Sequence, residues 1–418
     1  MSVETVCPDC ETELTLSLTG GAPWCPKCDW GLDRPFECEV TGVGWLDRLL
    51  FRAAYRRDRR QFQKYAGREV TRPGFGVPGA ILVVVSAGLL LATLGSLALA
   101  GWLVLTRLSV PNALAALGLV VLAWLLAPRY PDLTTEFERV DPATAPTLFA
   151  LVERIAAAAG VPAPDHLGIG RHFTASAWFS GFSRRRGLYL GLVMWAALPA
   201  QQRVAVIGHE MGHLIRGDAR SSVLTLPALT TFRNLSVLAA PWPRRPGGLL
   251  RLVVVDLLVR PVRILVSRVL LGIHVCLWLQ GVRRALLAEY HSDDLAVRIA
   301  GSAATRDFLD SLAGVGDLDE AVRRAARDSV DPQDWRAAAD EAREQIGPAL
   351  PWLRQFSIRT GTSILADHPP TGLRARAIEA RPWREPVVVL TQEESDRIDA
   401  ELADFYRRYA PDIGAPPP

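Results

Sequence analysis

A long stretch without charge constrains this chain more than any other feature of its sequence. Residues 74–106 contain no charged side chain, and a second, shorter apolar run follows over residues 110–127. A helix needs about 20 apolar residues to cross a bilayer, so the first stretch can span one with room to tilt. A buried pair of core helices is the alternative, but uncharged runs of this length favour lipid. We therefore expect a transmembrane helical hairpin over residues 78–128.

The composition agrees with a folded membrane protein. Of the 418 residues, 49% are hydrophobic and 22% are charged, which excludes a disordered or collagen-like chain. The net charge of +3 is too small to favour a nucleic acid as partner. Among the 47 basic residues only Lys27 and Lys64 are lysines, and this bias is typical of a bacterial source with a GC-rich genome.

Basic residues gather on one side of the predicted hairpin. Nine of them lie between residues 47 and 72 against three acidic residues, whereas the turn between the two spans carries Arg107 alone. The positive-inside rule then places both ends of the hairpin in the cytoplasm. Residues 42–73 read as a basic amphipathic segment next to the membrane, which we expect to lie on the anionic leaflet. The predicted location is a bacterial cell membrane, with several spans.

A further apolar zone covers residues 222–282, but arginines interrupt it. Isolated arginines such as Arg233 and Arg268 are expensive in lipid. Additional membrane helices and interfacial helices packed on the hairpin are both open for this zone.

Four cysteines near the N-terminus have the spacing of a zinc site. Cys7 and Cys10 form one C-x2-C pair, and Cys25 and Cys28 form a second pair after a gap of 14 residues. Such pairs on tight turns direct four sulfurs at one metal, so residues 1–41 are expected to form a zinc ribbon. Two disulfides in a secreted domain are the alternative, but no signal peptide precedes the first pair. Cys38 and Cys276 are expected to be unpaired.

The charge of the ribbon loops indicates which kind of partner the ribbon can bind. Its loops between residues 11 and 24 contain no arginine or lysine, so the usual contacts to nucleic-acid phosphates are missing. We expect the ribbon to bind a protein partner or to fold the N-terminus.

The segment 199–217 is predicted to form one helix that carries an H-E-x-x-H motif. His209 and His213 are four residues apart on one helical face and can bind one zinc ion. Glu210 lies beside them and can take a proton from a water at the metal as general base. Two exposed histidines on a surface helix are the alternative, but the surrounding residues are apolar and indicate a buried helix.

A third zinc ligand is expected from the helix-like stretch 283–296. A catalytic zinc has three protein ligands and one open position. Glu289 and Asp293 are spaced to face the same side, so Glu289 can complete the site and Asp293 can hydrogen-bond a ligand histidine. The alternative is the charged, solvent-facing side of an ordinary amphipathic helix.

Three ordered motifs carry a family resemblance. HEMGHLIRGD occupies residues 209–218, EYHSD follows at 289–293, and DHPPT lies at 367–371. In this order, after a transmembrane hairpin, they resemble the HtpX-like membrane zinc metallopeptidases, which are related to the CAAX prenyl endopeptidases. The resemblance covers roughly residues 80–380 and leaves out the ribbon and the C-terminal tail.

The resemblance implies a role for each matching residue. His209, His213 and Glu289 would bind zinc, Glu210 would be the catalytic base, and His368 would lie near the substrate and stabilise the oxyanion. Asp218 and Asp293 would support the ligands through hydrogen bonds.

The resemblance also implies how the peptide substrate binds. The Asn-Ala that family members place before the active helix corresponds here to Ser176-Ala177, and Ser292 stands where the family has alanine. Residues 187–194 read as an edge strand, which in zincins pairs with an extended peptide.

The predicted fold is therefore mainly α, with a zinc-ribbon N-terminus, a transmembrane helical hairpin and a zincin-type α+β metallopeptidase domain with a small edge sheet. The metallopeptidase domain covers residues 129–385, and a C-terminal helix and tail cover residues 386–418. Trp335, Trp352 and Phe356 are expected in its core, and residues 387–390 read as a short strand.

The function expected from these features is a membrane-bound zinc endopeptidase that cleaves membrane or misfolded proteins at the cytoplasmic face. It would hold two zinc ions, one catalytic and one structural. Its partners would be a polypeptide substrate, the lipid bilayer and a protein at the ribbon. The alternatives are a signalling protease whose single partner is recruited by the ribbon, and a non-catalytic zinc-binding membrane scaffold.

Overall fold

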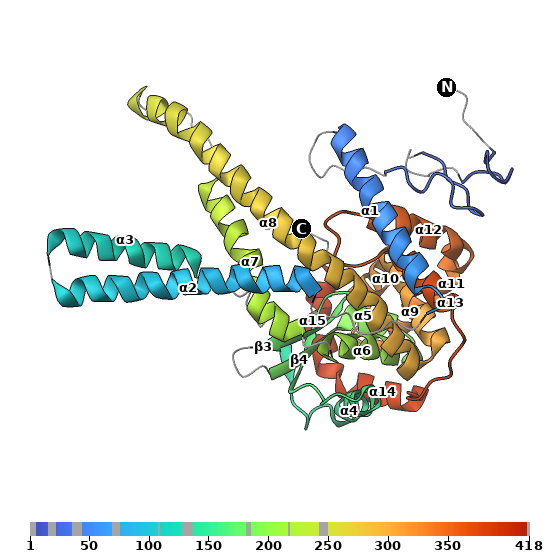
Figure 1. Cartoon of the computed structure of the whole chain (residues 1–418). Coiled ribbons are helices and arrows are strands. Elements are labelled where there is room, and N and C mark those ends of the chain that lie inside the picture. Colours follow the sequence, from blue (N-terminus) through green and yellow to red (C-terminus); the bar gives the residue numbers. More distant parts are fainter. Residues whose placement is uncertain are drawn as a thin grey trace. The chain divides into compact units, whose positions relative to one another are not determined.

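The computed structural model shows a mostly helical protein with one small mixed sheet (Figure 1). It describes residues 6–15, 22–35, 44–68, 76–107, 109–127, 137–180, 185–215, 218–241 and 250–415. The chain divides into two compact units. Unit 1 contains residues 1–73, 133–217 and 285–418, and unit 2 contains residues 74–132 and 218–284.

Unit 2 consists of long apolar helices. It contains α2 (Gly76–Thr106), α3 (Val110–Leu126), α7 (Asp218–Ala239) and the first part of α8 (Leu250–Ala300). Helices α2 and α3 run side by side in opposite directions, as the predicted hairpin requires (Figure 1). Two helical segments of the described chain, Gly76–Thr106 and Val259–Ala300, are long and apolar enough to cross a membrane, whereas α3 is shorter.

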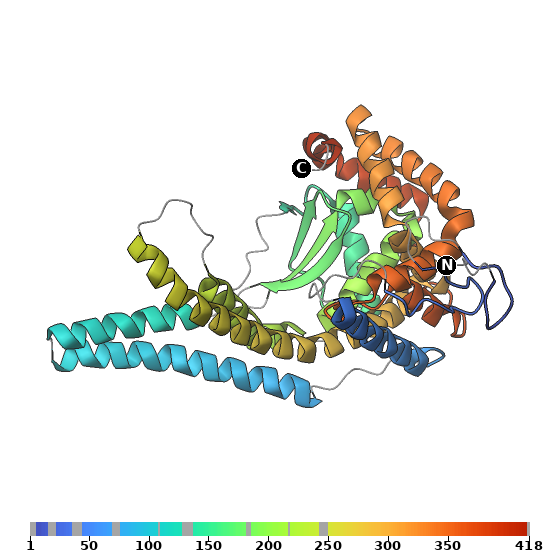
Figure 2. The same cartoon turned by 90° about the horizontal axis from the view of Figure 1, so that it is seen from above.

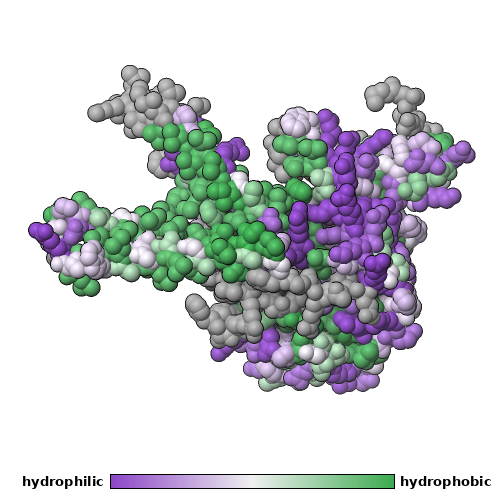
Figure 3. All heavy atoms as spheres, viewed as in Figure 1, coloured by the Kyte–Doolittle hydropathy of each residue, from purple (hydrophilic) through white to green (hydrophobic). Residues whose placement is uncertain are grey.

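Most of the buried residues on α2 are small. On α2, Ser86 and Ala100 are buried, and the Ser86 hydroxyl accepts a hydrogen bond of 3.1 Å from the backbone of Ala228 on α7. Large side chains such as Leu91 and Leu105 are exposed instead, so this unit has an apolar surface (Figure 3). An exposed apolar surface of this kind suits contact with lipid.

The sheet of unit 1 has four strands in the order β1-β2-β4-β3. The strands are β1 (Glu138–Val140), β2 (His166–Gly170), β3 (Ala175–Ser180) and β4 (Arg185–Gly191). Strands β2 and β4 pair in parallel, and the other two pairs are antiparallel. Strands β1 and β3 therefore form the two edges.

The prediction of an edge strand over residues 187–194 was wrong. Strand β4 lies between β2 and β3, its Leu188 and Leu190 are buried, and residues 192–197 already form helix α5 (Leu192–Ala197). The physical reason is that a continuous apolar run is typical of a strand covered on both faces, which sits inside a sheet. The more polar β3 is the edge on this side.

The helices of unit 1 lie to one side of the sheet (Figure 2). They are α1 (Gly44–Tyr65), α4 (Pro146–Ala159), α5, α6 (Ala200–Ile215), the last part of α8, α9 (Ser302–Ala313), α10 (Val315–Asp328), α11 (Pro332–Ile346), α12 (Leu350–Gly361), α13 (Thr371–Glu379), α14 (Gln392–Glu401) and α15 (Ala403–Gly414). Trp335 is fully buried in the main core, and the C-terminal helices add Ile398 and Phe405 to the same core. Trp352 and Phe356 are partly buried in a second cluster, which includes Trp24 of the ribbon.

The strand predicted at residues 387–390 was also wrong, since no described strand occupies this position. The backbone N–H groups of Val387 and Val388 both donate to the carbonyl of Ile299, at the end of α8. Val387 and Val389 are exposed, so the alternation of the sequence reflects an extended segment on the surface.

Candidate active site

Helix α6 is held in the core by its own buried side chains. Residues 202–212 are all buried, as expected for a helix that the fold covers on every side. Arg203 donates hydrogen bonds to the carbonyls of Trp195 and Leu198 at the end of α5. Its guanidinium also forms an ion pair with Asp399 of α14 at 3.1 Å, so the buried positive charge is balanced by a buried carboxylate. The position of α6 is therefore fixed by the core around it.

Two glycines let α6 approach α8 closely. A Cβ atom at Gly212 would lie 2.7 Å from the Cα of Ser292, and one at Gly208 would lie 3.4 Å from the Cα of Ala296. Because these glycines are four residues apart, they lie on one face of α6, against residues four apart on α8. This close packing brings the H-E-x-x-H motif against the stretch that begins with Glu289, and Gly212 makes room for a serine at position 292.

Three potential metal donors meet where the two helices cross. The Nε2 atoms of His209 and His213 are 3.2 Å apart. The Glu289 carboxylate lies 3.4 Å from His209 Nε2 through Oε2 and 3.3 Å from His213 Nε2 through Oε1. Donors about 2.0–2.1 Å from one tetrahedral zinc are separated by roughly 3.3 Å, so the three groups have the spacing of a zinc site.

One carboxylate oxygen of this cluster is buried among charged groups. Among the described residues, Oε2 of Glu289 has no neighbour in good hydrogen-bond geometry, although Arg374 forms an ion pair with it at 3.1 Å. A buried carboxylate oxygen without a hydrogen bond is costly. A cation at the centre of the three donors would add a direct partner for this oxygen, which agrees with a metal site.

Glu210 also lies next to the two histidines. Ligand atoms of Glu210, His209 and His213 all fall within 4.8 Å of one another. Burial raises the pKa of Glu210, and the backbone of Ala177 on β3 hydrogen-bonds to its carboxylate. The predicted base therefore lies between the metal donors and the edge strand of the sheet.

Asp293 orients the first histidine. Its Oδ1 lies 3.0 Å from Nδ1 of His209, and both groups are buried. Because an ionised carboxylate only accepts, Nδ1 carries the proton and Nε2 keeps its lone pair for a metal. Although burial alone would lower it, the hydrogen bonds that the ring donates to Asp293 and Glu289 raise the pKa of His209 to about 9. Zinc binding would then have to displace a proton.

Sequence reasoning missed Arg374, which joins the two carboxylates. Its buried guanidinium lies 3.1 Å from Glu289 and donates to both oxygens of Asp293, at 2.6 and 2.8 Å. The arginine keeps both groups ionised and fixes their orientation. The sequence did contain a signal for it. Arg374 lies three residues after the DHPPT motif, between Leu373 and Ala375, and an arginine between apolar residues indicates a buried charge.

His368 lies at the open side of the cluster. Its Nε2 is 3.6 Å from Oε1 of Glu289, and its side chain is 63% exposed. The carboxylate of Asp367 contacts Nδ1 at 2.8 Å, and this hydrogen bond raises the pKa of His368. The third motif is thus brought to the other two, in a position where His368 can reach a bound ligand.

The remaining sequence-predicted residues have different outcomes. The side chain of Asp218 and the whole of Cys38 lie outside the described residues. Ala177 of the Ser176-Ala177 pair is beside Glu210, as its place before the active helix implies. Cys276 is an exposed free cysteine.

The four ribbon cysteines form a separate cluster. Cys7 and Cys28 have their sulfurs 3.5 Å apart, and Cys10 and Cys25 have theirs 3.4 Å apart. All four sulfurs lie within 4.8 Å of one another. These separations are far longer than a disulfide bond of about 2.05 Å. They approach the roughly 3.8 Å expected for sulfurs around one zinc, so the cluster agrees with the predicted ribbon.

The segment around the second cysteine pair of the ribbon packs against helices α12 and α13. Gln355 of α12 accepts from the Trp24 indole at 3.0 Å and donates to the carbonyls of Cys25 and Pro26. Asp29 forms an ion pair with Arg376 of α13. The surface next to Cys25 is therefore occupied within unit 1.

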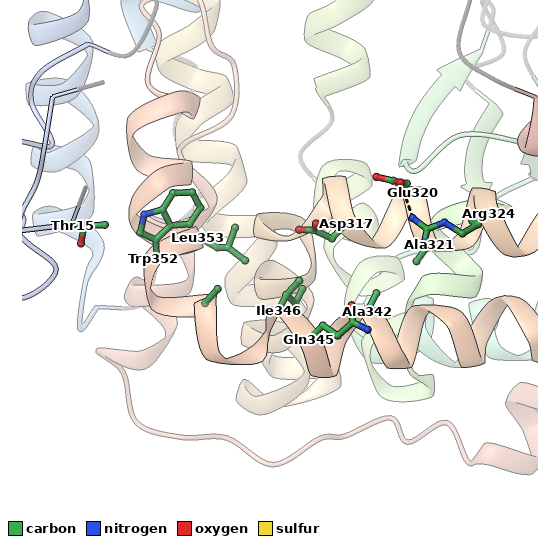
Figure 4. A pocket seen from close by; sticks show the side chains of 11 residues that line it. Thr15, Asp317, Glu320, Ala321, Arg324, Ala342, Gln345, Ile346, Trp352 and Leu353 are labelled. Carbon is green, nitrogen blue, oxygen red and sulfur yellow. Dashed lines mark hydrogen bonds and ion pairs between the residues drawn. The ribbon is translucent and has the colours of Figure 1, made fainter. Parts of the chain in front are cut away.

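The structure also contains a pocket away from these clusters. It has a volume of about 670 Å³ and is lined mainly by α10, α11 and α12, together with Thr15 (Figure 4). Trp352 lies at one side and the Glu320–Arg324 ion pair at the other. None of the metal-donor residues lines it, so it takes no part in the chemistry of the metal site.

Part of the chain is similar to known peptidases. The family model described as "Peptidase family M48" matches residues 142–382. Over 107 residues, or 25% of the chain, the sequence is 31% identical to a protein of Methanothermobacter thermautotrophicus described as "Protease HtpX homolog". The match spans 41% of that relative's length. No solved structure matches the chain.

Proposed function

The chain belongs to peptidase family M48, whose model matches more than half of it, and we propose that it is a membrane-bound zinc endopeptidase. His209, His213 and Glu289 would bind the metal, and Glu210 would be the general base. One observation carries the proposal: three donor groups lie 3.2–3.4 Å from one another, with a fourth, buried carboxylate beside them.

The residues fit a catalytic zinc better than a structural one. Two imidazoles and one carboxylate leave one coordination position open, which is the arrangement of zinc hydrolases. When bound there, zinc would polarise the scissile carbonyl and make the attacking water more acidic. Glu289 is preferred to Glu210 as the third ligand because its two oxygens contact both Nε2 atoms.

Glu210 would move the proton. Its buried carboxylate, with its raised pKa, is a stronger base than an exposed glutamate. It would accept a proton from the attacking water on a carboxylate oxygen and then give it to the nitrogen of the leaving amine. The same residue thus serves as base and then as acid.

Strand β3 would position the peptide. It is a free edge of the described sheet, so an extended substrate can add to it through backbone hydrogen bonds. Ala177 on this strand contacts Glu210, which would place the scissile bond next to the base. His368, whose pKa is raised by its hydrogen bond to Asp367, would as an imidazolium donate from Nε2 to the developing oxyanion.

The substrates would be membrane or misfolded proteins, cleaved at the cytoplasmic face. Two helices long enough to cross a membrane support the membrane setting, and the basic residues before α2 support the orientation. Reporter tags at residues 20, 109 and 340 should read cytoplasm, outside and cytoplasm. A tag at residue 340 that reads outside would reverse the proposed orientation.

The activity is tested with the purified full-length chain. We expect it to cleave an unfolded reporter protein, to lose this activity with a chelator and to regain it with zinc. Glu210→Gln should bind zinc and remain inactive. A chain that holds its zinc fully and cleaves no unfolded or membrane-anchored reporter would be a zinc-binding scaffold, which would overturn the proposal.

A further inference from the structure

One face of α1 carries five cations in a row. Arg48, Arg52, Arg56, Arg60 and Lys64 follow one another at four-residue intervals, and all are exposed. Residues four apart lie on neighbouring turns of the same helical face. They therefore form a single basic stripe along α1, where Figure 3 shows a band of hydrophilic residues.

The opposite face of α1 fixes the direction of this basic stripe. Phe51 and Ala54 are buried, and the ring of Tyr65 lies 5.8 Å from that of Tyr290. Arg57 donates to the carbonyls of Ser363 and Ile364 at 3.0 and 3.3 Å. Because these contacts tie α1 to the rest of unit 1, the stripe faces outward as part of the folded surface.

The charge of the stripe is not neutralised within its helix. The acidic residues of α1 are Asp47 and Asp58, and both are buried. The neighbouring Arg57 and Arg59 do pair, with Asp58 at 2.8 Å and Asp29 at 3.1 Å. Among the described residues, by contrast, no carboxylate lies within 4.0 Å of a stripe cation. The arginines of α1 that form ion pairs are the ones that attach it to the rest of unit 1. The cations of the stripe are exposed and can therefore bind an external anion.

Two exposed apolar residues accompany the stripe. Trp45 is 65% exposed and Leu49 is 58% exposed, and their spacing places them beside Arg48 and Arg52. A helix that combines arginine or lysine with exposed tryptophan and leucine is typical of binding to a membrane interface. Only residues 66–75 separate α1 from α2, which is apolar enough to enter a membrane.

We propose that the basic stripe of α1 binds the anionic phospholipid headgroups of the membrane that α2 enters. Five cations provide the charge, and Trp45 with Leu49 provides the apolar contact that a free anion or a nucleic-acid backbone does not need. The proposal does not depend on the peptidase activity. It makes α1 a lipid-binding surface of the unit that holds the metal donors.

The expected effect is large and depends on salt. Each arginine or lysine near an anionic surface strengthens binding by about fivefold, so reversing three charges should weaken it by more than ~10²-fold. Raising the salt concentration to about 1 M shortens the screening length to about 3 Å and should also release the stripe.

The test uses the full-length chain with a photo-crosslinking benzoylphenylalanine at the exposed Ala53. The protein is placed in nanodiscs of phosphatidylcholine alone, or with a third of phosphatidylglycerol, and crosslinked lipid is measured by mass. We expect phosphatidylglycerol to raise the yield about tenfold or more. The combined variant Arg48→Glu, Arg52→Glu and Arg56→Glu should abolish the increase. Added inorganic phosphate should act no more strongly than sodium chloride of equal ionic strength.

A matched control keeps the test specific. Arg324→Glu, Arg397→Glu and Arg407→Glu reverse three arginines whose side chains are 66%, 56% and 61% exposed on other helices of unit 1. This variant should crosslink like the wild type, and zinc content should show that both variants fold. Equal yields with and without phosphatidylglycerol would overturn the proposal. So would stripe-dependent binding of a labelled RNA oligonucleotide at physiological salt, which would assign the stripe to nucleic acid.

Discussion

The two clusters of metal-binding side chains in unit 1 are built in opposite ways. The four ribbon cysteines come from two turns within 22 residues of each other, and Cys28 is exposed. His209 and Glu289 are 80 residues apart in the chain, on helices α6 and α8, and both are buried in the core. One cluster is local in sequence and partly exposed, whereas the other exists only because the whole unit is folded.

The difference predicts which structural changes would disrupt each cluster. In the ribbon, the ligands are positioned by the turns next to them, and Gln355 and Arg376 attach the finished turn to the unit. In the proposed peptidase site, the positions of the donor groups depend on the close crossing of α6 and α8. Loss of a ribbon ligand is expected to affect the ribbon site and to leave the peptidase site intact. The peptidase site is expected to lose its metal when the packing of α6 against α8 changes.

The largest effect is expected from Gly212→Ala. The new Cβ would lie 2.7 Å from the backbone of Ser292, so α8 would have to shift and carry Glu289 away from the histidines. A displacement of about 1 Å can cost ~10²-fold in rate, and we expect at least that loss together with the peptidase-site zinc. The ribbon zinc should remain. Activity and zinc per chain are measured on the same preparation.

Gly208→Ala is the matched control for this variant. It adds the same methyl group on the same face of α6, but its nearest neighbour, the Cα of Ala296, is 3.4 Å away. We expect it to keep both zinc ions and most of the activity. Equal damage by both substitutions would show that the crossing point at Gly212 has no special role.

The next largest effect separates two arginines on α13. Arg374 contacts the carboxylates of the peptidase site, and Arg376 contacts Asp29 of the ribbon. Arg374→Met should lower activity or zinc affinity by roughly 10- to 100-fold, because the partners that orient a metal ligand typically contribute that much. Arg376→Met should leave the site intact and make the ribbon more sensitive to protease. If the two variants behaved alike, the clusters would not be independent.

Removing the ribbon ligands should have a smaller effect on catalysis. Cys7→Ser with Cys10→Ser should reduce the zinc content from two ions to one, since the remaining pair cannot complete the site. The peptidase donors come from helices that contain no ribbon residue, so the activity should fall by less than about tenfold. Loss of both zinc ions would contradict the independence of the two clusters.

The smallest effect is a pH dependence of the metal-free chain. The pKa of His209 is raised from its ordinary 6.5 to about 9, so the charged imidazole stabilises the fold fully below pH 6.5. This stabilisation is lost as the pH rises through about 9. The thermal midpoint of the metal-free chain should therefore fall by a few degrees over this range. The metal-free His209→Gln variant should not show this fall, and a parallel decrease in both would exclude His209 as its source.

Much of the site could be predicted from the sequence because its spacing is helical. The intervals between His209 and His213, and between Glu289 and Asp293, each place two side chains on one face. Arg374 could not be assigned in the same way, since its partners are set by how α13 packs against α8. The fit of Gly212 against Ser292 likewise depends on two helices whose crossing is invisible in either segment alone.

The sequence predicted secondary structure correctly where a residue pattern was long or specific, and short apolar runs left the prediction ambiguous. The apolar run of α2 and the cysteine spacing predicted their structures correctly. The apolar run of β4 was placed at an edge although its burial on both faces puts it inside the sheet. The valines at residues 387–390 lack a neighbouring strand, which only the tertiary structure reveals.

The most direct test of the central claim compares two carboxylates that have different roles. Zinc per chain and cleavage of an unfolded reporter are measured for Glu210→Gln and Glu289→Gln in the same membranes. Glu210→Gln should keep two zinc ions and lose activity by at least ~10²-fold, because only the base is removed. Glu289→Gln should lose the peptidase-site zinc, because a neutral amide replaces an anionic ligand. If Glu289→Gln held two zinc ions and still cleaved the reporter, Glu289 would not be the third ligand, and the proposed zinc site would be wrong.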